Sequence, residues 1–527
     1  MTTTNKYDNI PVEKFQFAKR NDLHHDKKFD TKPVSYLQGA LRRFCKNKGA
    51  VVAAVVIAIL LLFAIVAPFC TPYTAATKNE LFASARPKNP LFVNTNFWDG
   101  CRVKETSYLG YLRDYALAAE TGKGVIKNNK VEIIEDEDGG QVFKYRYDTY
   151  YGVGFGKYKE ISEEEFNDIQ RYQNETGRQV LYPIVKGGQN GRGDRPKTEQ
   201  DKDDANIYYK TEVVKGKAQP VLDEEGNLIP VYWVDNGTSL AAEYNSLRIE
   251  GNDSDVKYVY GQFLNGGYVE VRLETYEYYT YEHTQKYKDG IGEPLFLFGT
   301  TDAESGGKDI FACLANGARF SFIFATVVAI VNLIVGAIWG SISGYFGGKI
   351  DLFMERVCEI LGAVPMMIVI TLLKYHMGSS SHVLVLFISF FATGWIGMAG
   401  TTRMQFYRFK NQEYVLAART LGASDARIMF KHIFPNGLGT IVTRCALVIP
   451  SMIYTETNLS YLGIINLEAG NITSVGTMIA TGQGNLMPAP YMVLFPCIFL
   501  VLLMLSFNLF GNGLRDAFNP SLRGSED

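Results

Sequence analysis

The feature that most constrains this chain is the separation of its apolar and polar residues into long blocks. Residues 50–68 are almost all Ala, Val, Ile, Leu and Phe, and they carry no charge. A helix of about this length crosses the roughly 30 Å hydrocarbon core of a bilayer. A cleaved signal peptide fits poorly, because the leader is long and the apolar stretch exceeds a normal signal core. The overall composition, 47% hydrophobic and 20% charged, therefore averages a membrane part and a polar part.

Apolar segments resume after residue 310 and predict five further membrane spans. Gly, Ser and Thr are frequent inside them, as expected where helices pack closely in lipid. The fourth of these segments is the least apolar, because it contains Arg444, Pro450 and Glu456. The segments lie near residues 318–343, 352–373, 383–402, 440–463 and 490–511.

The distribution of basic residues predicts the orientation of the six spans. Residues 1–49 carry 11 Lys and Arg, and the loop 401–439 carries 6. The loops predicted on the opposite side, 374–382 and 464–489, contain Lys374 alone. Short basic loops stay in the cytoplasm. We therefore expect a multi-pass protein with both termini cytoplasmic.

The N-terminal region divides into two parts. Residues 1–35 are polar, without apolar periodicity, and are expected to form a flexible cytoplasmic tail. Residues 36–48 place apolar side chains at helical spacing with basic residues among them. This pattern predicts an amphipathic helix at the membrane surface, directly before the first span, within a unit of residues 36–72.

Residues 73–297, the polar block, lie between the first and second predicted spans and so outside the cell. They contain 28 Lys and Arg against 37 Asp and Glu, so the block is acidic. Apolar alternation on both sides of Asp138-Gly-Gly, and again on both sides of Glu225-Gly-Asn, predicts two hairpins. Ser162 followed by Glu165 has capping-box spacing for one helix. The block is predicted to be a β-rich α+β domain.

Several sequence patterns narrow the chemistry. No Gly-x-x-x-x-Gly-Lys-Ser/Thr occurs, so this sequence has no phosphate-binding loop for ATP. The cysteines form no CxxC pair and the histidines no HExxH, so we expect no cofactor or metal on the chain. A net charge of −2 argues against nucleic-acid binding. The tyrosines of residues 276–281 either bind a partner or peptide, or alternate along a strand to build a core.

The most informative stretch is the elbow segment, residues 413–436, inside the predicted cytoplasmic loop 403–438. Ala417 and Ala418 allow another surface to approach closely, and Gly422 permits a turn that other residues resist. Ser424 and Asp425 are suited to start a second helix, and Pro435 is expected to end it before the next span. A helix–glycine–helix elbow of this kind can sit in a groove on a partner and transmit its movement.

The elbow segment resembles the "EAA loop" of ABC importer permeases of the oligopeptide/dipeptide family. That pattern is Glu-Ala-Ala, three residues, Gly, and Pro thirteen residues later, which Ala417, Ala418, Gly422 and Pro435 match. Leu416 stands in place of the Glu, and Glu413, one turn earlier, is the candidate to replace it. His432 occupies a position that is usually apolar. The remaining residues of the candidate coupling site are Ala423, Ser424 and Asp425.

Other segments are similar to the same family. They include Gly299-Thr-Thr-Asp302 with Gly307-Lys-Asp309, Glu456-Thr-Asn-Leu-Ser-Tyr-Leu-Gly463, and Gly511-Asn-Gly-Leu-Arg-Asp-Ala-Phe-Asn-Pro520. The resemblance covers residues 36–72 and 298–523, the latter forming the permease core, but not the polar block. It implies an all-α domain of six spans, as in type I ABC importers, with the polar block inserted between helices 1 and 2.

The resemblance also implies partners and a mechanism. The chain would pair with a homologous permease as a heterodimer, and two cytoplasmic ATPases, holding ATP and Mg, would bind the elbow segments. An extracellular binding protein would deliver a peptide, and alternating access would move it across the bilayer. The chain itself would not be an enzyme.

Two charged residues of the fourth segment have alternative interpretations. Arg444 either has a role inside the membrane or lies at the cytoplasmic edge and extends to water, which we favour. Glu456 either lines the pathway or is a structural hydrogen-bond partner near the outer end. For the chain as a whole, two other functions stay open. One is transport of another small solute such as a metal chelate, and the other is a membrane-anchored extracellular binding or adhesion module.

Overall fold

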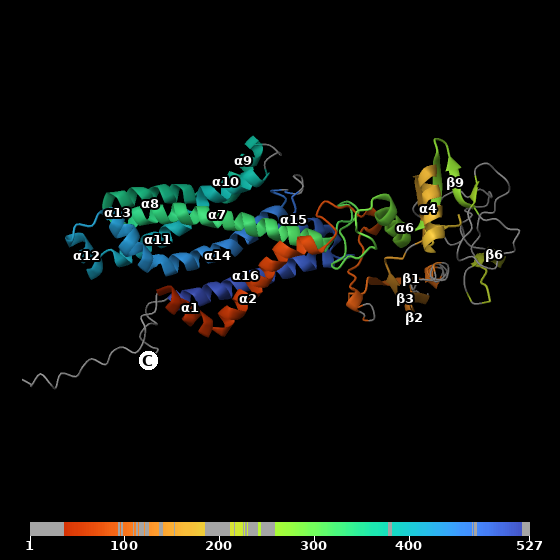
Figure 1. Cartoon of the computed structure of the whole chain (residues 1–527), viewed down its shortest axis with the longest axis horizontal. Coiled ribbons are helices and arrows are strands. Elements are labelled where there is room, and N and C mark those ends of the chain that lie inside the picture. Colours follow the sequence, from red (N-terminus) through yellow and green to blue (C-terminus); the bar gives the residue numbers. More distant parts are fainter. Residues whose placement is uncertain are drawn as a thin grey trace, which may run out of the picture.

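The computed structural model describes most of the chain between Tyr36 and Phe518. Its gaps are residues 93–94, 96–97, 109, 112–113, 115–120, 122–125, 136–140, 152, 185–210, 215–216, 225, 227–228, 230–240, 244–258, 378–381, 466 and 468–471. A helical bundle forms one end of the molecule, and the polar block forms the other (Figure 1). The predicted flexible tail, residues 1–35, lies outside the described residues.

The bundle contains the predicted apolar helices. Within the described residues, five helical segments are long and apolar enough to cross a membrane, and a bent pair makes a sixth if it is counted as one span. Four of the segments are α2 (Lys48–Cys70), α7 (Ile310–Phe346), α16 (Tyr491–Phe518), and α10 (His382–Gly394) together with α11 (Ile396–Phe409). The fifth runs from Asp425 to Tyr461 and includes α14 (Phe434–Tyr461).

The span predicted near residues 352–373 is bent in the structure. This part of the chain forms α8 (Gly348–Gly362) and α9 (Met366–Met377), which meet at 68°. The break coincides with Pro365, which has no N–H for a helical bond and disfavours helical backbone at Val364 before it. The bend therefore follows from the position of one proline.

The prediction of a simple loop over 464–489 was also incomplete. The structure has α15 (Val475–Gly482) here, followed by the short turn η10 (Gln483–Asn485). Ser474 begins α15 with a reciprocal capping box to Thr477, in which each side chain bonds the other residue's backbone N–H. Because α15 has only eight residues, its apolar content was too short to suggest a buried helix.

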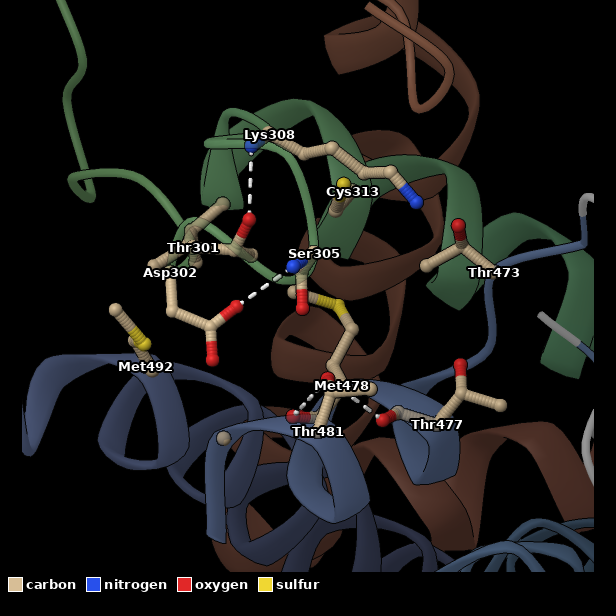
Figure 2. A pocket seen from close by; sticks show the side chains of 12 residues that line it. Thr301, Asp302, Ser305, Lys308, Cys313, Thr473, Thr477, Met478, Thr481 and Met492 are labelled. Atoms are coloured by element: carbon tan, nitrogen blue, oxygen red, sulfur yellow. Dashed lines mark hydrogen bonds between the residues drawn. The ribbon is translucent and has the colours of Figure 1, made fainter. Parts of the chain in front are cut away.

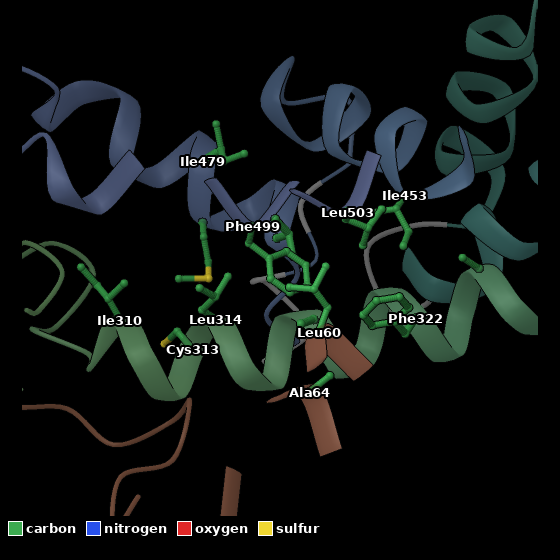
Figure 3. Packing of buried hydrophobic residues seen from close by; sticks show 14 of the residues in the cluster. Leu60, Ala64, Ile310, Cys313, Leu314, Phe322, Ile453, Ile479, Phe499 and Leu503 are labelled. Atoms are coloured by element: carbon green, nitrogen blue, oxygen red, sulfur yellow. The ribbon is translucent and has the colours of Figure 1, made fainter. Parts of the chain in front are cut away.

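The main core joins α2, α7, α14, α15 and α16. Leu60 and Ala64 of α2 pack toward Phe322 of α7, while Phe499 and Leu503 of α16 close the cluster from the other side (Figure 3). The packing of α2 on α7 and α16 places the first span beside the second and last, although about 240 residues separate α2 from α7 in sequence. The N-terminal helix α1 (Tyr36–Lys46) follows the prediction. It packs on the end of α16, where Arg43 Nε donates to the carbonyl of Ala517 at 2.9 Å.

A row of glycines brings α7 and α11 into close contact. Gly336, Gly340 and Gly344 recur every fourth residue, so they share one face of α7. A Cβ at Gly336 would lie 2.7 Å from the carbonyl oxygen of Trp395, and one at Gly344 would lie 2.7 Å from that of Arg403. The α11 backbone therefore occupies the space that side chains would otherwise fill, which is the small-residue packing expected in lipid.

The polar block contains both strands and helices, as predicted. One sheet has the order β1-β3-β2, a second has β4-β10-β9-β8 with β5 paired to β10, and β6 pairs with β7. The strands are β1 (Cys101–Ser107), β2 (Ile126–Glu135), β3 (Gln141–Asp148), β4 (Val153–Ser162), β5 (Leu181–Tyr182), β6 (Thr211–Val214), β7 (Lys217–Pro220), β8 (Ala241–Glu243), β9 (Val259–Leu264) and β10 (Tyr268–Glu274). The helices are α4 (Glu163–Thr176) and α6 (Thr275–Tyr281), with the turns η3 (Glu80–Phe82), η4 (Pro90–Phe92) and η6 (Glu282–Lys286).

The detailed predictions for the polar block had mixed outcomes. Antiparallel pairing of β2 and β3 confirms the first hairpin, whose turn at 136–140 lies outside the described residues. Ser162 caps α4 by accepting from the N–H of Glu165, as predicted. Residue 225 and most of the second predicted hairpin are not described, and β7 pairs with β6 instead. The tyrosines of 276–281 lie on α6, not on a strand, and most are buried, which supports a core role.

An aromatic seam joins the polar block to the bundle. Phe82, Tyr279 and Phe296 form a buried cluster that includes Ala312 in the first turn of α7. The hydroxyl of Tyr279 donates to Asn79 Oδ1 at 2.6 Å within this cluster. Both ends of the polar block are thus held at the same end of the bundle.

Candidate functional site

The elbow segment lies at the end of the bundle opposite the polar block (Figure 1). Its first limb is α12 (Glu413–Thr420), which ends in a turn at Gly422 with φ +78°. This left-handed conformation is costly for residues with a Cβ. The N–H of Gly422 donates to the carbonyl of Arg419 at 3.0 Å, and that of Ala423 to Ala418 at 3.1 Å. The predicted helix–glycine–helix geometry is therefore present.

The inner face of the elbow segment is packed against the bundle. Val415 and Ile428, one from each limb, are fully buried beside Tyr345 of α7 and Phe406 of α11. Ala418 is buried with them, whereas Ala417 is exposed. The two alanines of the motif thus have different environments, one toward the bundle and one toward solvent.

Polar contacts hold the turn to the end of α7. The hydroxyl of Tyr345 donates to Asp425 Oδ1 at 2.5 Å, and Arg419 Nη2 lies 3.4 Å from the same hydroxyl. Beside the turn, Lys410 Nζ donates to the carbonyl of Gly344 at 2.9 Å, near the negative end of α7. Burial lowers the pKa of Lys410, and burial also raises the pKa of Tyr414 on α12.

The second limb differs from the prediction. α13 (Asp425–Arg427) continues through a π-helical turn, η8 (Ile428–Ile433), directly into α14. Pro435 therefore does not end this limb but stands in the first turn of α14, where a missing N–H is tolerated. Ser424 precedes α13 with extended backbone, but its side chain makes no capping bond. His432 is half-buried in the π-turn, and its carbonyl accepts from Asn436.

The outer face of the elbow segment is apolar and exposed. Leu421, next to the turn, is 87% exposed, and Leu416 and Phe430 are about half exposed. Glu413 is exposed in the first turn of α12, one turn before Leu416. Apolar side chains clustered around a fixed turn are typical of a surface that another protein covers.

A carboxylate network behind the elbow segment ties three helices together. Asp351 on α8 accepts from Arg403 Nε at 2.6 Å and from Arg403 Nη2 at 2.7 Å. The hydroxyl of Tyr407 on α11 donates to it at 2.6 Å, and that of Ser343 on α7 also donates to it. Asp351 is buried, so this two-bond arginine–carboxylate pair is well placed to fix α8 against α7 and α11.

We expect Asp351→Ala to destabilise the bundle by about 3 kcal/mol, because Arg403 loses its two-bond partner and keeps only the more distant contact with Glu355 at 3.6 Å. The measurement is the thermal unfolding of the purified chain in detergent. Arg356→Ala is the matched control, since it breaks an exposed pair with Glu359 on the same helix and should change stability by less than about 1 kcal/mol. Equal effects of the two substitutions would contradict a structural role for the Asp351 pair.

Glu456 is buried between α14 and α15. Its side chain is only 1% exposed. Oε1 accepts from Ser474 Oγ at 2.7 Å and from Ser460 Oγ at 3.0 Å, which links α14 to the capping residue of α15. The position suits a hydrogen-bond partner between helices. Arg444, the other charged residue, is exposed in the first half of α14.

A small cavity beneath the polar block was not anticipated. It has a volume of about 20 Å³, enough for roughly one water molecule, and lies between the loop before α7, α15 and α16 (Figure 2). Asp302 accepts from the N–H of Ser305 at its rim, while Thr477 and Thr481 line the opposite wall. The Gly299–Asp309 segment marked this loop in the sequence, but not its contact with α15.

Among the described residues, no group of three or more His, Cys, Asp or Glu side chains is placed to hold a metal ion. The seven cysteines, all within the described part, are free thiols.

These features define a polytopic membrane protein with a fixed, exposed elbow at one end, the class to which transport permeases belong. The family "Binding-protein-dependent transport system inner membrane component" matches residues 336–524, and "N-terminal TM domain of oligopeptide transport permease C" matches residues 35–87. The chain is 43% identical to the oligopeptide transport system permease protein OppC of Bacillus subtilis over 226 residues, 43% of this chain and 72% of the relative.

Two other relatives extend the comparison. The dipeptide transport system permease protein DppC of Lactococcus lactis is 39% identical over 249 residues, 47% of this chain and 70% of the relative. The peptidoglycan transport system permease protein YejE of Agrobacterium fabrum is 33% identical over 243 residues, 45% of this chain and 62% of the relative. The chain belongs to the oligopeptide/dipeptide family of ABC transporter permeases.

Proposed function

We propose that this chain is the transmembrane subunit of an ATP-driven importer for oligopeptides and forms half of the translocation pathway. It pairs with a homologous permease as a heterodimer, and an extracellular binding protein delivers the peptide. The family membership and the relatives that carry oligopeptide and dipeptide names support this assignment.

The elbow segment is the proposed contact for one of two cytoplasmic ATPases, which hold the ATP and Mg; the other ATPase binds the corresponding segment of the homologous permease. The observation that carries this proposal is its two-sided character. Val415 and Ile428 anchor the inner face in the bundle, while Leu416 and Leu421 are exposed on the outer face. The inner face of the elbow segment is packed against the bundle, and its outer face is apolar and exposed. A movement of a partner bound to the outer face can therefore be transmitted to α7, α11 and α14.

The proposed topology has six spans, with α8 and α9 counted as one. Both termini and the coupling loop 403–438 lie in the cytoplasm, and residues 73–297 form an inserted extracellular domain. The Lys and Arg distribution supports this orientation. So does the structure's separation of the elbow segment and the polar block to opposite ends of the bundle (Figure 1). We propose that Glu413 replaces the glutamate missing at Leu416, since it is exposed on the same short helix.

Besides oligopeptides, two other kinds of transported substrate are candidates. Similarity to a permease named for peptidoglycan transport favours cell-wall peptides as a second candidate, and metal chelates are a third. In a different class, the spans would serve only as an anchor for an extracellular binding or adhesion module. A bundle that only anchors the polar block does not explain why the elbow segment, at the opposite end, has an exposed apolar surface.

Purification of the tagged chain from its native membrane in mild detergent tests the function. We expect mass spectrometry to find a second permease and ATPases that contain phosphate-binding loops, and we expect the complex to hydrolyse ATP. Recovery of the chain alone, or with surface proteins and without an ATPase, would overturn the importer and support the anchored module. Binding of peptides or chelates to the co-purified extracellular protein would separate the cargo classes.

A further inference from the structure

A second site is present at the elbow end of the bundle, apart from the elbow segment itself. A cavity of about 480 Å³ lies between the last turns of α11, the first half of α14 and the end of α16. This volume falls within the range of about 300–1,000 Å³ that is usual for ligand sites. Its lining residues are Thr401, Gln405, Arg408, Gly439, Thr440, Thr443, Arg444, Leu447, Arg515 and Phe518.

Three arginines meet at this cavity, one from each helix. Arg408 comes from α11, Arg444 from α14 and Arg515 from α16, and the lining includes no carboxylate. In the part of the chain that the structure describes, none of the three forms an ion pair. Guanidinium groups stay charged at every physiological pH, so gathering three of them without an anion is unfavourable. The three arginines are exposed, and together they give the cavity a positive charge that suits a negatively charged ligand.

The other lining residues describe the shape of that ligand. The side chains of Thr401, Gln405 and Thr440 add neutral hydrogen-bonding groups beside the guanidiniums. Leu447 lies three residues beyond Arg444, which places it on the same side of α14 and deeper in the apolar span. The ligand that fits has a compact, multiply accepting anion at one end and an apolar part at the other.

We propose that this cavity binds the phosphodiester headgroup of an anionic phospholipid. Arginine pairs with phosphate through two parallel hydrogen bonds, and basic pockets between membrane helices at one membrane face are suited to anionic headgroups. Arg408 and Arg515 lie in the last turns of helical segments apolar enough to span the membrane, and Arg444 of α14 lines the same cavity, which places the site at headgroup depth. A free phosphate or a peptide carboxylate would use the arginines but not the apolar side at Leu447.

The test measures phospholipid retained by the purified full complex after exchange into detergent, quantified by mass spectrometry per copy of the chain. The cavity variant combines Arg408→Gln, Arg444→Gln and Arg515→Gln. The control combines Arg42→Gln, Lys46→Gln and Lys48→Gln, which removes the same charge from exposed positions outside the cavity. We expect phosphatidylglycerol retention to fall about tenfold or more in the cavity variant and by much less in the control, whose residues lie on the predicted membrane-surface helix or next to it.

Three outcomes would overturn the proposal. Equal losses in both variants would mean general attraction to a basic surface. Undiminished retention in the cavity variant would place the lipid elsewhere. Protection of the parent from thermal unfolding by inorganic phosphate as strongly as by phosphatidylglycerol would identify a soluble anion. If the triple variant does not fold, Arg444→Gln and Arg515→Gln are examined singly, and loss of the phosphatidylglycerol-dependent rise in melting temperature is the expected result.

Discussion

Replacing Gly422 with valine should reduce ATP-driven peptide uptake by about tenfold or more while leaving the bundle folded. Gly422 has φ +78°, and no atom of this chain lies within 4 Å of the place where its Cβ would be. The substitution therefore acts through the backbone, where left-handed geometry costs a residue with a side chain about 1–2 kcal/mol. A difference of about 1.4 kcal/mol is tenfold in the population of the competent elbow.

Two further variants separate the causes. Gly177→Val is the matched control, because Gly177 has φ +71°, equally open surroundings, and a place at the end of α4 in the polar block. It should leave uptake nearly unchanged. Gly422→Ala introduces the same strain with less bulk, so a loss like that of valine would assign the effect to backbone strain. Normal uptake with Gly422→Val, at normal expression, would refute the proposed role of this turn.

Gly340→Leu should prevent the bundle from forming a stable membrane domain. A Cβ at Gly340 would collide with the carbonyl oxygen of Ala399, and the same Cβ would lie 2.8 Å from the Cβ of Thr402. Backbone cannot move aside as a flexible side chain can, so α7 and α11 must separate along their contact. Overpacking costs about 1–3 kcal/mol even where neighbours can adjust, and we expect the upper end or more.

The control for this prediction is Gly400→Leu, on α11 itself. Gly400 is exposed, and nothing in the chain lies within 4 Å of its Cβ position. The substitution therefore replaces a helical glycine with leucine but causes no collision with another helix. Both variants are compared by monodispersity and melting temperature of the purified chain in detergent. A melting temperature for Gly340→Leu equal to that of Gly400→Leu would show that the glycine row does not set the spacing of the helices.

The membrane helices were predictable because their composition is sufficient to define them. An uncharged apolar stretch such as residues 50–68 is stable only in lipid or in a protein core. Because it is long enough to cross the hydrocarbon core of a bilayer, a membrane span is the better assignment. The bend between α8 and α9 was not predicted, because the residues on both sides of Pro365 are apolar. Apolar composition does not reveal a change in the direction of a helix axis. The buried helix α15 was missed because eight residues carry too little periodicity.

At the elbow, the sequence predicted the turn but not the course of the second limb. Gly422 stood out because few other residues adopt its backbone conformation. Pro435 was misread as a terminator, since a proline near a helix start and one near a helix end look alike without knowledge of where the helix begins. The contacts of Tyr345 with Asp425 and of Arg403 with Asp351 join residues 52 to 80 positions apart. No local pattern contains such pairs, and the arginine cavity was missed for the same reason.

The continuous helical segment from Asp425 to Tyr461, which includes the π-helical turn η8 and Pro450, has a mechanical consequence. Its 37 residues form a rod roughly 55 Å long, with the elbow turn at one tip and Glu456 near the other. A rod of that length converts a tilt of about 5° at the elbow into a displacement of roughly 5 Å at the far end. Such a movement passes through one helix, so it does not depend on a series of side-chain contacts. The hydrogen bond between Glu456 and Ser474 lies near the far end, where such a displacement would be largest.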